Sequence, residues 1–371
     1  MPVRQHKPAK VYFWPLSVSS KAPYAQRMRR LFKATNLGSR IQSGDLVALK
    51  MHFGEHGGTA FVQPHWLIPL IDILRKAGTH PFLTDTNTLY MGQRQEAVSH
   101  SLLAAMHGFD PLRLGAPVLI ADGLKSHNEI SVPGIGHHFE HCYLAGDLLD
   151  ADVMITITHF TGHELTGFGG VIKNLAMGCA SRQGKMHQHC GLGPKVHTSK
   201  CVGCGRCVEV CAPGALALNQ SGVVVLDQAA CTGCANCIQA CKHGCLYINW
   251  DLDLPIFQER MVEYAGAFLH AFSCPLLHIS FLLQITPKCD CKAYSEVPVC
   301  GDLGILASYD PVALDQASLD LVNRAVQKEA SQTLDQDVFA ALHPNSEGQL
   351  ALELAEKLGL GCREYFWEIV Q

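Results

Sequence analysis

The chain has 371 residues, of which 48% are hydrophobic and 17% are charged, and its formal net charge is −4. This length favours two or more domains with a substantial core, and the nearly neutral charge provides no basic field for a nucleic-acid partner and no polybasic membrane patch. The first twenty residues lack the apolar run of a secretory signal. We therefore expect a cytoplasmic protein with no membrane span.

Short apolar runs alternate with helical periods through the first half of the chain. The runs predict strands at 45–51, 81–86, 117–123 and 151–160, and the periods predict helices at 65–78 and about 93–107. The strongest strand is 151–160, where Val153, Ile155 and Ile157 alternate with Met and Thr. Apolar strands alternating with amphipathic helices predict an α/β fold with an open, largely parallel sheet and helices on both faces.

The pattern is interrupted in the middle of the chain and then resumes. From about residue 195 to 250, cysteine and glycine become frequent and one pattern occurs twice. A helix at 261–272, strands at 277–285 and 305–308, and a helix that starts at Asp310 and Pro311 follow. We therefore predict one α/β domain in two parts, residues 1–194 and 251–371, with a small α+β ferredoxin-like module, residues 195–250, inserted between them.

The repeated pattern is C-x2-C-x2-C-x3-C, the spacing that wraps a loop around an iron–sulfur cube. In two-cluster ferredoxins the fourth cysteine of each run binds the other cluster. The prediction is two [4Fe–4S] clusters, one on Cys201, Cys204, Cys207 and Cys241 and the other on Cys231, Cys234, Cys237 and Cys211. A pair of zinc sites is the alternative, but zinc ligands usually come as two separated pairs.

Two details depart from bacterial two-cluster ferredoxins, which the module resembles. The proline that usually follows the fourth cysteine is displaced to Pro213 in the first run and replaced by Lys242-His243 in the second. Cys245 is close enough in sequence to be a rival ligand. Both details concern the ligand assignment and leave the cluster prediction in place.

Polar side chains gather where the predicted strands end, and ligands of an open α/β sheet bind beyond those carboxyl ends. The candidate catalytic residues there are Lys50, His52, Asp85, His159, His163 and Lys173. In this hypothesis Lys50 and Lys173 hold a small anion, one of the histidines His159 and His163 supplies a proton, and Asp85 orients that histidine. The same two histidines could instead be a metal pair.

Glycines crowd the segment that leaves the strongest strand. Gly167, Gly169 and Gly170 permit a close approach of the backbone to a ligand, and Lys173 and Asn174 follow in the first turn of a helix. These residues could form a loop that binds an anion or cofactor at free backbone amides. The alternative is a tight strand-to-helix turn.

A third group of cysteines follows the last long strand. Cys289 and Cys291 flank Asp290, and Cys300 and Cys179 could converge with them. These residues could bind an additional metal, form a redox-active thiol pair, or be buried free thiols.

Five ordered motifs resemble the uncharacterised iron–sulfur-centre proteins of domain-of-unknown-function family 362. The resemblance covers roughly residues 45–317, and it implies an α/β domain coupled to two [4Fe–4S] clusters. The motifs are KMHFGE from Lys50, PFLTDTNTLY from Pro81, GHELTGFGGVIKNLAMGCASRQGK from Gly162, TPKCDC from Thr286 and DLGILASYDPVALDQA from Asp302.

These features favour an oxidoreductase of anaerobic type, in which a ferredoxin or flavodoxin partner supplies electrons for a small anionic substrate, or for a metal or cofactor, at the edge of the sheet. Two alternatives stay open: an electron carrier without chemistry of its own, and a maturation protein that delivers a metal or cofactor. We find no flavin or nicotinamide fingerprint.

Overall fold

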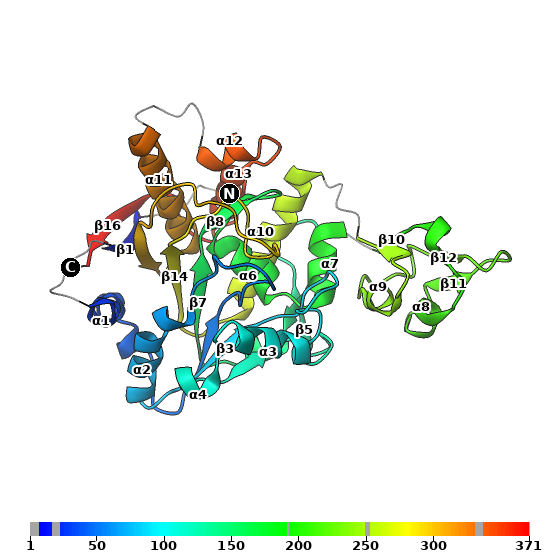
Figure 1. Cartoon of the computed structure of the whole chain (residues 1–371), viewed down its shortest axis with the longest axis horizontal. Helices are drawn as coiled ribbons and strands as arrows, with labels where there is room; N and C mark the ends of the chain where they lie inside the picture. The colour runs from blue at the N-terminus through cyan, green and yellow to red at the C-terminus, as the bar shows by residue number, and fades with distance from the viewer. Residues whose placement is uncertain (1–6, 17–22, 191–192, 249–252, 331–336, 371) are drawn as a thin grey trace.

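The computed structural model describes residues 7–16, 23–190, 193–248, 253–330 and 337–370. A larger part built around one sheet carries a small module at one end (Figure 1). We call residues 193–248 the cysteine module and the rest of the described chain the α/β body.

The α/β body contains an eight-stranded sheet in the order β16-β1-β15-β14-β7-β2-β3-β4. Five of its neighbouring pairs are parallel, and β15 is antiparallel to both of its neighbours. The open, largely parallel sheet is therefore confirmed. Its strands are β1 (Ala9–Pro15), β2 (Leu46–Lys50), β3 (His80–Asp85), β4 (Val118–Ile120), β7 (Val153–His159), β14 (Leu276–Leu282), β15 (Gly304–Ser308) and β16 (Tyr365–Ile369).

Helices cover both faces of this sheet, as predicted, because successive side chains of a buried strand point to opposite faces. In β7, Val153, Ile155 and Ile157 enter one core while Met154 enters the other. The first core lies under α1 (Tyr24–Thr35), α2 (Ile68–Lys76) and α3 (Ala97–Met106). The second lies under α6 (Val171–Cys179), α10 (Leu254–Ala271), α11 (Pro311–Ala330) and α13 (Gly348–Lys357).

Helix starts follow their capping chemistry. Asp310 Oδ1 accepts a hydrogen bond from the backbone N–H of Ala313 at 2.9 Å, and Pro311 opens α11. The predicted helix at 93–107 begins later, at Ala97, because the Glu96 carboxylate accepts the backbone N–H groups of the first turn. The predicted helix at 65–78 is divided into a 3-10 turn, η2 (Pro64–Trp66), and α2.

Smaller elements connect these layers. Two short hairpins are formed by β5 (Glu129–Pro133) with β6 (His141–Ala145) and by β8 (Thr161–His163) with β9 (Gly167–Gly169). The remaining elements of the body are η1 (Leu37–Ser39), α4 (Pro111–Leu114), α5 (Gly146–Leu149), α7 (Arg182–Cys190) and α12 (Val338–Leu342).

The cysteine module lies between α7 and α10 in the chain, and the sheet takes strands from both sides of it. Two-stranded sheets join β10 (Lys195–Val196) to β13 (Leu246–Tyr247) and β11 (Leu216–Leu218) to β12 (Val224–Leu226), with η3 (Thr198–Lys200), α8 (Arg206–Glu209) and α9 (Asn236–Ala240) between strands. Two residues of the α/β body, Leu89 and Met186, complete its core.

Side-chain hydrogen bonds also join the two parts. Gln239 Nε2 in α9 donates to the carbonyl of Leu89 at 3.3 Å, and His187 Nε2 in α7 lies 3.0 Å from the carbonyl of Thr232. The cysteine module is thus attached to the body through α7 and the loop after β3.

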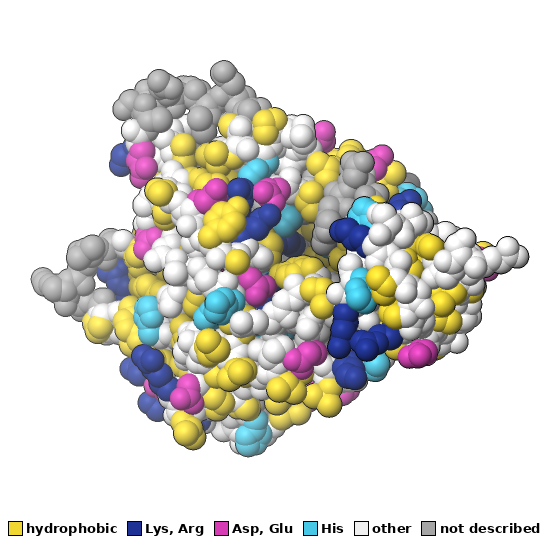
Figure 2. All heavy atoms as spheres, turned by 45° about the vertical axis from the view of Figure 1, so that its right-hand side comes forward, with side chains coloured by type: hydrophobic (Ala, Val, Ile, Leu, Met, Phe, Trp, Pro, Cys, Tyr) yellow, Lys and Arg dark blue, Asp and Glu magenta, His cyan; other side chains and the backbone are white. Residues whose placement is uncertain are grey.

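The face shown in Figure 2 mixes Lys and Arg side chains with Asp and Glu. In the described part of the chain, no helix combines the length and the apolar character that a membrane crossing requires.

Candidate functional site

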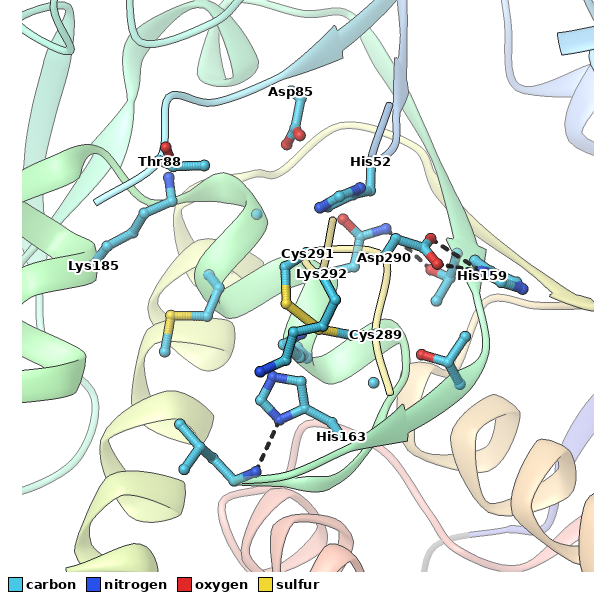
Figure 3. Close-up of a pocket in the computed structure, with 18 of the residues that line it drawn as sticks. His52, Asp85, Thr88, His159, His163, Lys185, Cys289, Asp290, Cys291 and Lys292 are labelled. Atoms are coloured by element: carbon cyan, nitrogen blue, oxygen red, sulfur yellow. Dashed lines mark hydrogen bonds and ion pairs between the residues drawn. A yellow bond between two sulfur atoms is a disulfide. The ribbon is translucent and has the colours of Figure 1, made fainter. Parts of the chain in front are cut away.

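A cavity of about 560 Å³ lies at the carboxyl ends of the parallel strands β2, β3 and β7. The structure brings all six candidate catalytic residues to its wall, together with Gly169, Gly170 and Asn174. Gly167 does not line it. Figure 3 shows side chains from both halves of the sequence facing this space. Parallel strands place their carboxyl ends along one edge, which is why residues far apart in the chain meet here.

A buried ion pair forms one side of the cavity. Lys50 Nζ lies 2.9 Å from Asp85 Oδ1 and donates to Asn174 Oδ1, also at 2.9 Å. Arg94 Nη1 and His100 Nε2 approach the other oxygen, Asp85 Oδ2, at 3.7 and 3.8 Å. Burial favours the neutral acid, but Lys50 and its cationic neighbours hold the pKa of Asp85 well below its usual range.

Two sequence hypotheses about this pair need correction. Asp85 orients neither His159 nor His163, because its partners are Lys50, Arg94 and His100. Lys50 is already neutralised by Asp85, so it is a poor holder of a second anion.

His159 is held at both ring nitrogens. Its Nδ1 lies 2.8 and 3.0 Å from the two carboxylate oxygens of Asp290, and its Nε2 lies 2.7 Å from the carbonyl of Leu283. Burial lowers its pKa, but Asp290 and these hydrogen bonds together raise it above the usual value. His159 is therefore an imidazolium that fixes the loop carrying Asp290, and it is not available to give a proton to a ligand.

His163 and His52 have the opposite character. The backbone N–H groups of Leu165 and Thr166 donate to His163 Nδ1 at 3.2 Å, and that of Gly54 donates to His52 Nδ1 at 2.9 Å. Burial holds the pKa of both histidines well below the usual value. Each ring is thus neutral with its proton on Nε2, and His163 is the better hydrogen-bond donor of the two candidates named from the sequence.

The glycine segment is packed against protein and is not an open cradle. The free N–H groups of Val171 and Ile172 at the start of α6 donate to the two oxygens of Asp315 at 2.6 and 2.9 Å. A Cβ on Gly170 would lie 2.3 Å from Asp315 Oδ1. The predicted anion loop is therefore wrong in this respect: a carboxylate of α11 already occupies the helix N-terminus.

Gly167 is needed for a turn and a close contact. Its φ is +73°, and a Cβ there would lie 2.7 Å from the backbone of Gly348. Asn174, the last member of the predicted loop, acts through its side chain: its amide binds Lys50 and Thr158. The tight-turn alternative accounts for the glycines.

Two lysines, Lys185, which is buried, and Lys173, which is partly buried, give the cavity its unbalanced positive charge. Among the described residues, none forms a hydrogen bond or ion pair with Lys173 Nζ. Lys185 Nζ donates to Thr86 Oγ1 and to the carbonyl of Ala180, both at 2.6 Å. Burial lowers the pKa of each lysine to about 8. Lys185 was missed from the sequence because it lies in α7 and follows no strand end.

Cys289 and Cys291 form a disulfide in the wall of the cavity (Figure 3). A ring nitrogen of His163 and the two sulfur atoms lie within 4.8 Å of one another, a group that could hold a metal ion. Cys179 and Cys300 are buried but do not line the cavity, so the expected convergence of all four cysteines is not found.

The cysteines of the repeated motif form two groups in the module. Burial raises the pKa of Cys207, and the neighbouring Cys241 and Cys201 raise it further. A second, small cavity is lined by another set of these cysteines, namely Cys211, Cys231, Cys234 and Cys237. Each group thus contains the fourth cysteine of the other run.

Cys245 lies beside the first of these groups. Its backbone N–H donates to Cys241 Sγ at 3.3 Å, and its thiol forms a hydrogen bond with Cys201. The backbone N–H of Val224 also donates to Cys201 Sγ at 3.3 Å. N–H donors aimed at sulfur stabilise thiolates, the form in which cysteine binds metal.

The family model described as Domain of unknown function (DUF362) matches residues 47–320. The chain belongs to the DUF362 family. None of the curated proteins matches its sequence. The family model spans β2 to α11 and includes both the cavity residues and the cysteine module.

Two solved structures resemble this DUF362 chain at 10% identity. One is a structural-genomics protein from Thermotoga maritima, with a TM-score of 0.42 over 84% of this chain and 59% of that one. The other is the lactate racemase apoprotein from Thermoanaerobacterium thermosaccharolyticum, with a TM-score of 0.44 over 85% of this chain and 57% of that one. The DUF362 chain therefore spans less than two thirds of either protein.

Proposed function

We propose that this DUF362 protein is an iron–sulfur oxidoreductase. Two [4Fe–4S] clusters in the cysteine module would pass electrons to a small anionic substrate in the cavity. The contact between the module and the cavity wall carries the proposal. Leu89 lines the cavity, packs into the core of the module, and accepts a hydrogen bond from Gln239, two residues after Cys237.

The cysteines of the module fit such clusters. Four of them line one small cavity and Cys201, Cys207 and Cys241 lie near one another, while backbone N–H groups are directed at Cys201 and Cys241. The four cysteine sulfurs that bind a [4Fe–4S] cluster lie farther apart than four sulfurs that bind a single metal ion. The spread of Cys211, Cys231, Cys234 and Cys237 around a small cavity is therefore compatible with a cluster. When bound, the clusters supply single electrons at low potential.

The charge of the cavity supports an anionic substrate. Its lining carboxylates all have partners: Asp85 pairs with Lys50, Asp290 with His159 and Glu164 with Lys292. Lys173 remains without such a partner among the described residues. An anion beside Lys173 would compensate the charge of that lysine, while the N–H of His163 Nε2 would donate a hydrogen bond to the anion.

Anion binding should weaken as the pH rises through about 8. Burial lowers the pKa of Lys173 to about 8, and only its ammonium form attracts an anion. Affinity for phosphate or oxalate, measured by isothermal titration calorimetry, should therefore fall about tenfold per pH unit above that value. Lys173→Met should abolish the dependence, whereas Lys10→Met on the surface should leave it unchanged. An unchanged slope in Lys173→Met would assign the anion to another group.

The electron transfer itself can be followed by absorbance. Protein purified anaerobically and reduced by a ferredoxin would be mixed with a panel of small anions, and reoxidation of the clusters recorded. One class of anion should reoxidise wild-type clusters, and His163→Gln should slow this at least about tenfold without loss of cluster absorbance. Loaded clusters that no anion reoxidises would favour the electron carrier instead.

A further inference from the structure

The loop after β14 places two cysteines in the cavity wall on either side of an anchored residue. Asp290 lies between Cys289 and Cys291, and both of its carboxylate oxygens bind His159. Thr286 Oγ1 also donates to the carbonyl of Lys288 at 2.6 Å. The two sulfurs are bonded to each other and belong to the lining of the cavity. Anchoring of this kind keeps a reactive pair in place while its bond opens and closes.

The hydrogen bonds of His163 indicate whether Cys289 and Cys291 bind a metal or take part in thiol chemistry. A histidine that binds a metal through one ring nitrogen usually donates its other N–H to an acceptor. His163 Nδ1 instead accepts two backbone N–H groups, from Leu165 and Thr166. Metal binding at Nε2 would then require a fully deprotonated ring. The arrangement favours a neutral imidazole that keeps its proton on Nε2 and has a ring nitrogen within 4.8 Å of both sulfur atoms (Figure 3).

We propose that Cys289 and Cys291 are a redox-active pair that accepts electrons from the module and reduces a small anionic disulfide. The inference rests on the proposed function for its source of electrons. Thiols exchange electrons with disulfides through a mixed disulfide, which defines the substrate class. Lys173 in the same wall defines its charge.

The reaction balances in two halves. In the first, the Cys289–Cys291 bond breaks as it takes up two electrons and two protons, giving two thiols. Two equivalents of a reduced one-electron carrier of the ferredoxin or flavodoxin class supply the electrons by way of the module. Solvent supplies both protons, and the N–H of His163 Nε2 donates a hydrogen bond to the sulfur that carries negative charge before it is protonated.

In the second half, one cysteine attacks the substrate disulfide as its thiolate, forming a mixed disulfide and releasing the first substrate thiol. The other cysteine attacks this mixed disulfide. The Cys289–Cys291 bond forms again and the second substrate thiol leaves. The net change is one substrate disulfide and two protons converted to two thiols by two electrons.

Differential alkylation tests the pair directly. Anaerobically purified holoprotein would be oxidised with glutathione disulfide, treated with light iodoacetamide, reduced with ferredoxin, and treated with heavy iodoacetamide before mass spectrometry. We expect Cys289 and Cys291 each to carry the heavy label. A second addition of glutathione disulfide, in place of the heavy reagent, should release two glutathione thiols per chain.

Matched variants separate the pair from other thiols and from direct reduction. Cys274→Ser, at an exposed free cysteine, should behave as wild type, whereas Cys291→Ser should retain Cys289 as a mixed disulfide with glutathione, detected by its added mass. In Cys204→Ala/Cys234→Ala, which removes a ligand from each cluster, ferredoxin-driven labelling should slow at least about tenfold. Dithiothreitol should still label both cysteines in that variant.

Three results would overturn the inference. They are complete light labelling of the pair after glutathione disulfide, a metal bound to the wild type that disappears in Cys291→Ser, and equal labelling rates with and without intact clusters. Failure of the proposed function looks different. Wild-type protein would then lack iron and cluster absorbance, while dithiothreitol and glutathione disulfide would still cycle the pair.

Discussion

Asp85→Asn should destabilise the folded chain by about 3–5 kcal/mol, because it leaves the buried ammonium of Lys50 without its counter-ion. The two side chains are 1% and 6% exposed, and their atoms lie 2.9 Å apart. Asparagine keeps the volume of the side chain, so the effect would report lost charge and not a cavity. Guanidinium denaturation followed by circular dichroism would measure it.

The chain contains a matched control for this prediction. Lys10 and Glu368 also lie 2.9 Å apart, but they are 43% and 42% exposed. Glu368→Gln should cost less than about 1 kcal/mol, since solvent screens exposed pairs. Equal losses in the two variants would contradict the prediction. Adding Lys50→Met to Asp85→Asn should restore most of the stability.

The free energy of unfolding that the Lys50–Asp85 ion pair contributes should also depend on pH. The pKa of Asp85 is held well below its usual range, so its contribution is present above the unfolded pKa of about 3.9. That contribution should be lost as the pH falls below about 4, toward the folded pKa. Asp85→Asn should lack this part of the acid dependence.

Replacing two cysteines of the repeated motif should remove one cluster or disrupt both clusters, depending on which two are replaced. If the ligands cross between the motifs, Cys211→Ala/Cys234→Ala removes two ligands from one cluster and spares the other. About four of about eight irons should remain, with one intact [4Fe–4S] signal in electron paramagnetic resonance.

The contrasting variant is Cys204→Ala/Cys211→Ala, whose two cysteines belong to the same sequence run. Under the crossed arrangement it removes one ligand from each cluster, so no intact four-cysteine cluster should remain. The reverse outcome, with an intact cluster in this variant and none in the first, would show that each run binds its own cluster. A zinc content in place of iron would contradict the cluster proposal altogether.

The central strands could be predicted because burial on both faces produces apolar runs, as in β2, β7 and β14. The outer strands β1 and β16 were not predicted. Several of their aromatic and charged residues, such as Phe13 and Trp367, are partly exposed, and β1 pairs with strands from the far end of the chain. Such pairing leaves no local pattern, since register depends on partners hundreds of residues away.

The cavity residues could be placed because strand ends in a parallel sheet share one edge. The hydrogen bonds and ion pairs that these residues form could not be predicted. Asp290 follows β14, yet its oxygens bind His159 of β7, and Asp315 of α11 fills the helix start expected to hold a ligand. Both carboxylates lie more than a hundred residues from their partners. Sequence spacing indicates which groups reach an edge but not which charges neutralise one another there.

The order of strands in the sheet sets a limit on when it can close during synthesis. β1 is made before the other strands of the sheet, yet its two neighbours are β15 and β16, about 290 and 350 residues later in the chain. β7 likewise waits for β14 while the entire cysteine module is made. The edge of β7 therefore stays unpaired until β14 has been made, and both edges of β1 stay unpaired until β15 and β16 follow. A chain that ends before Gly304 would expose both edges of β1 to other chains.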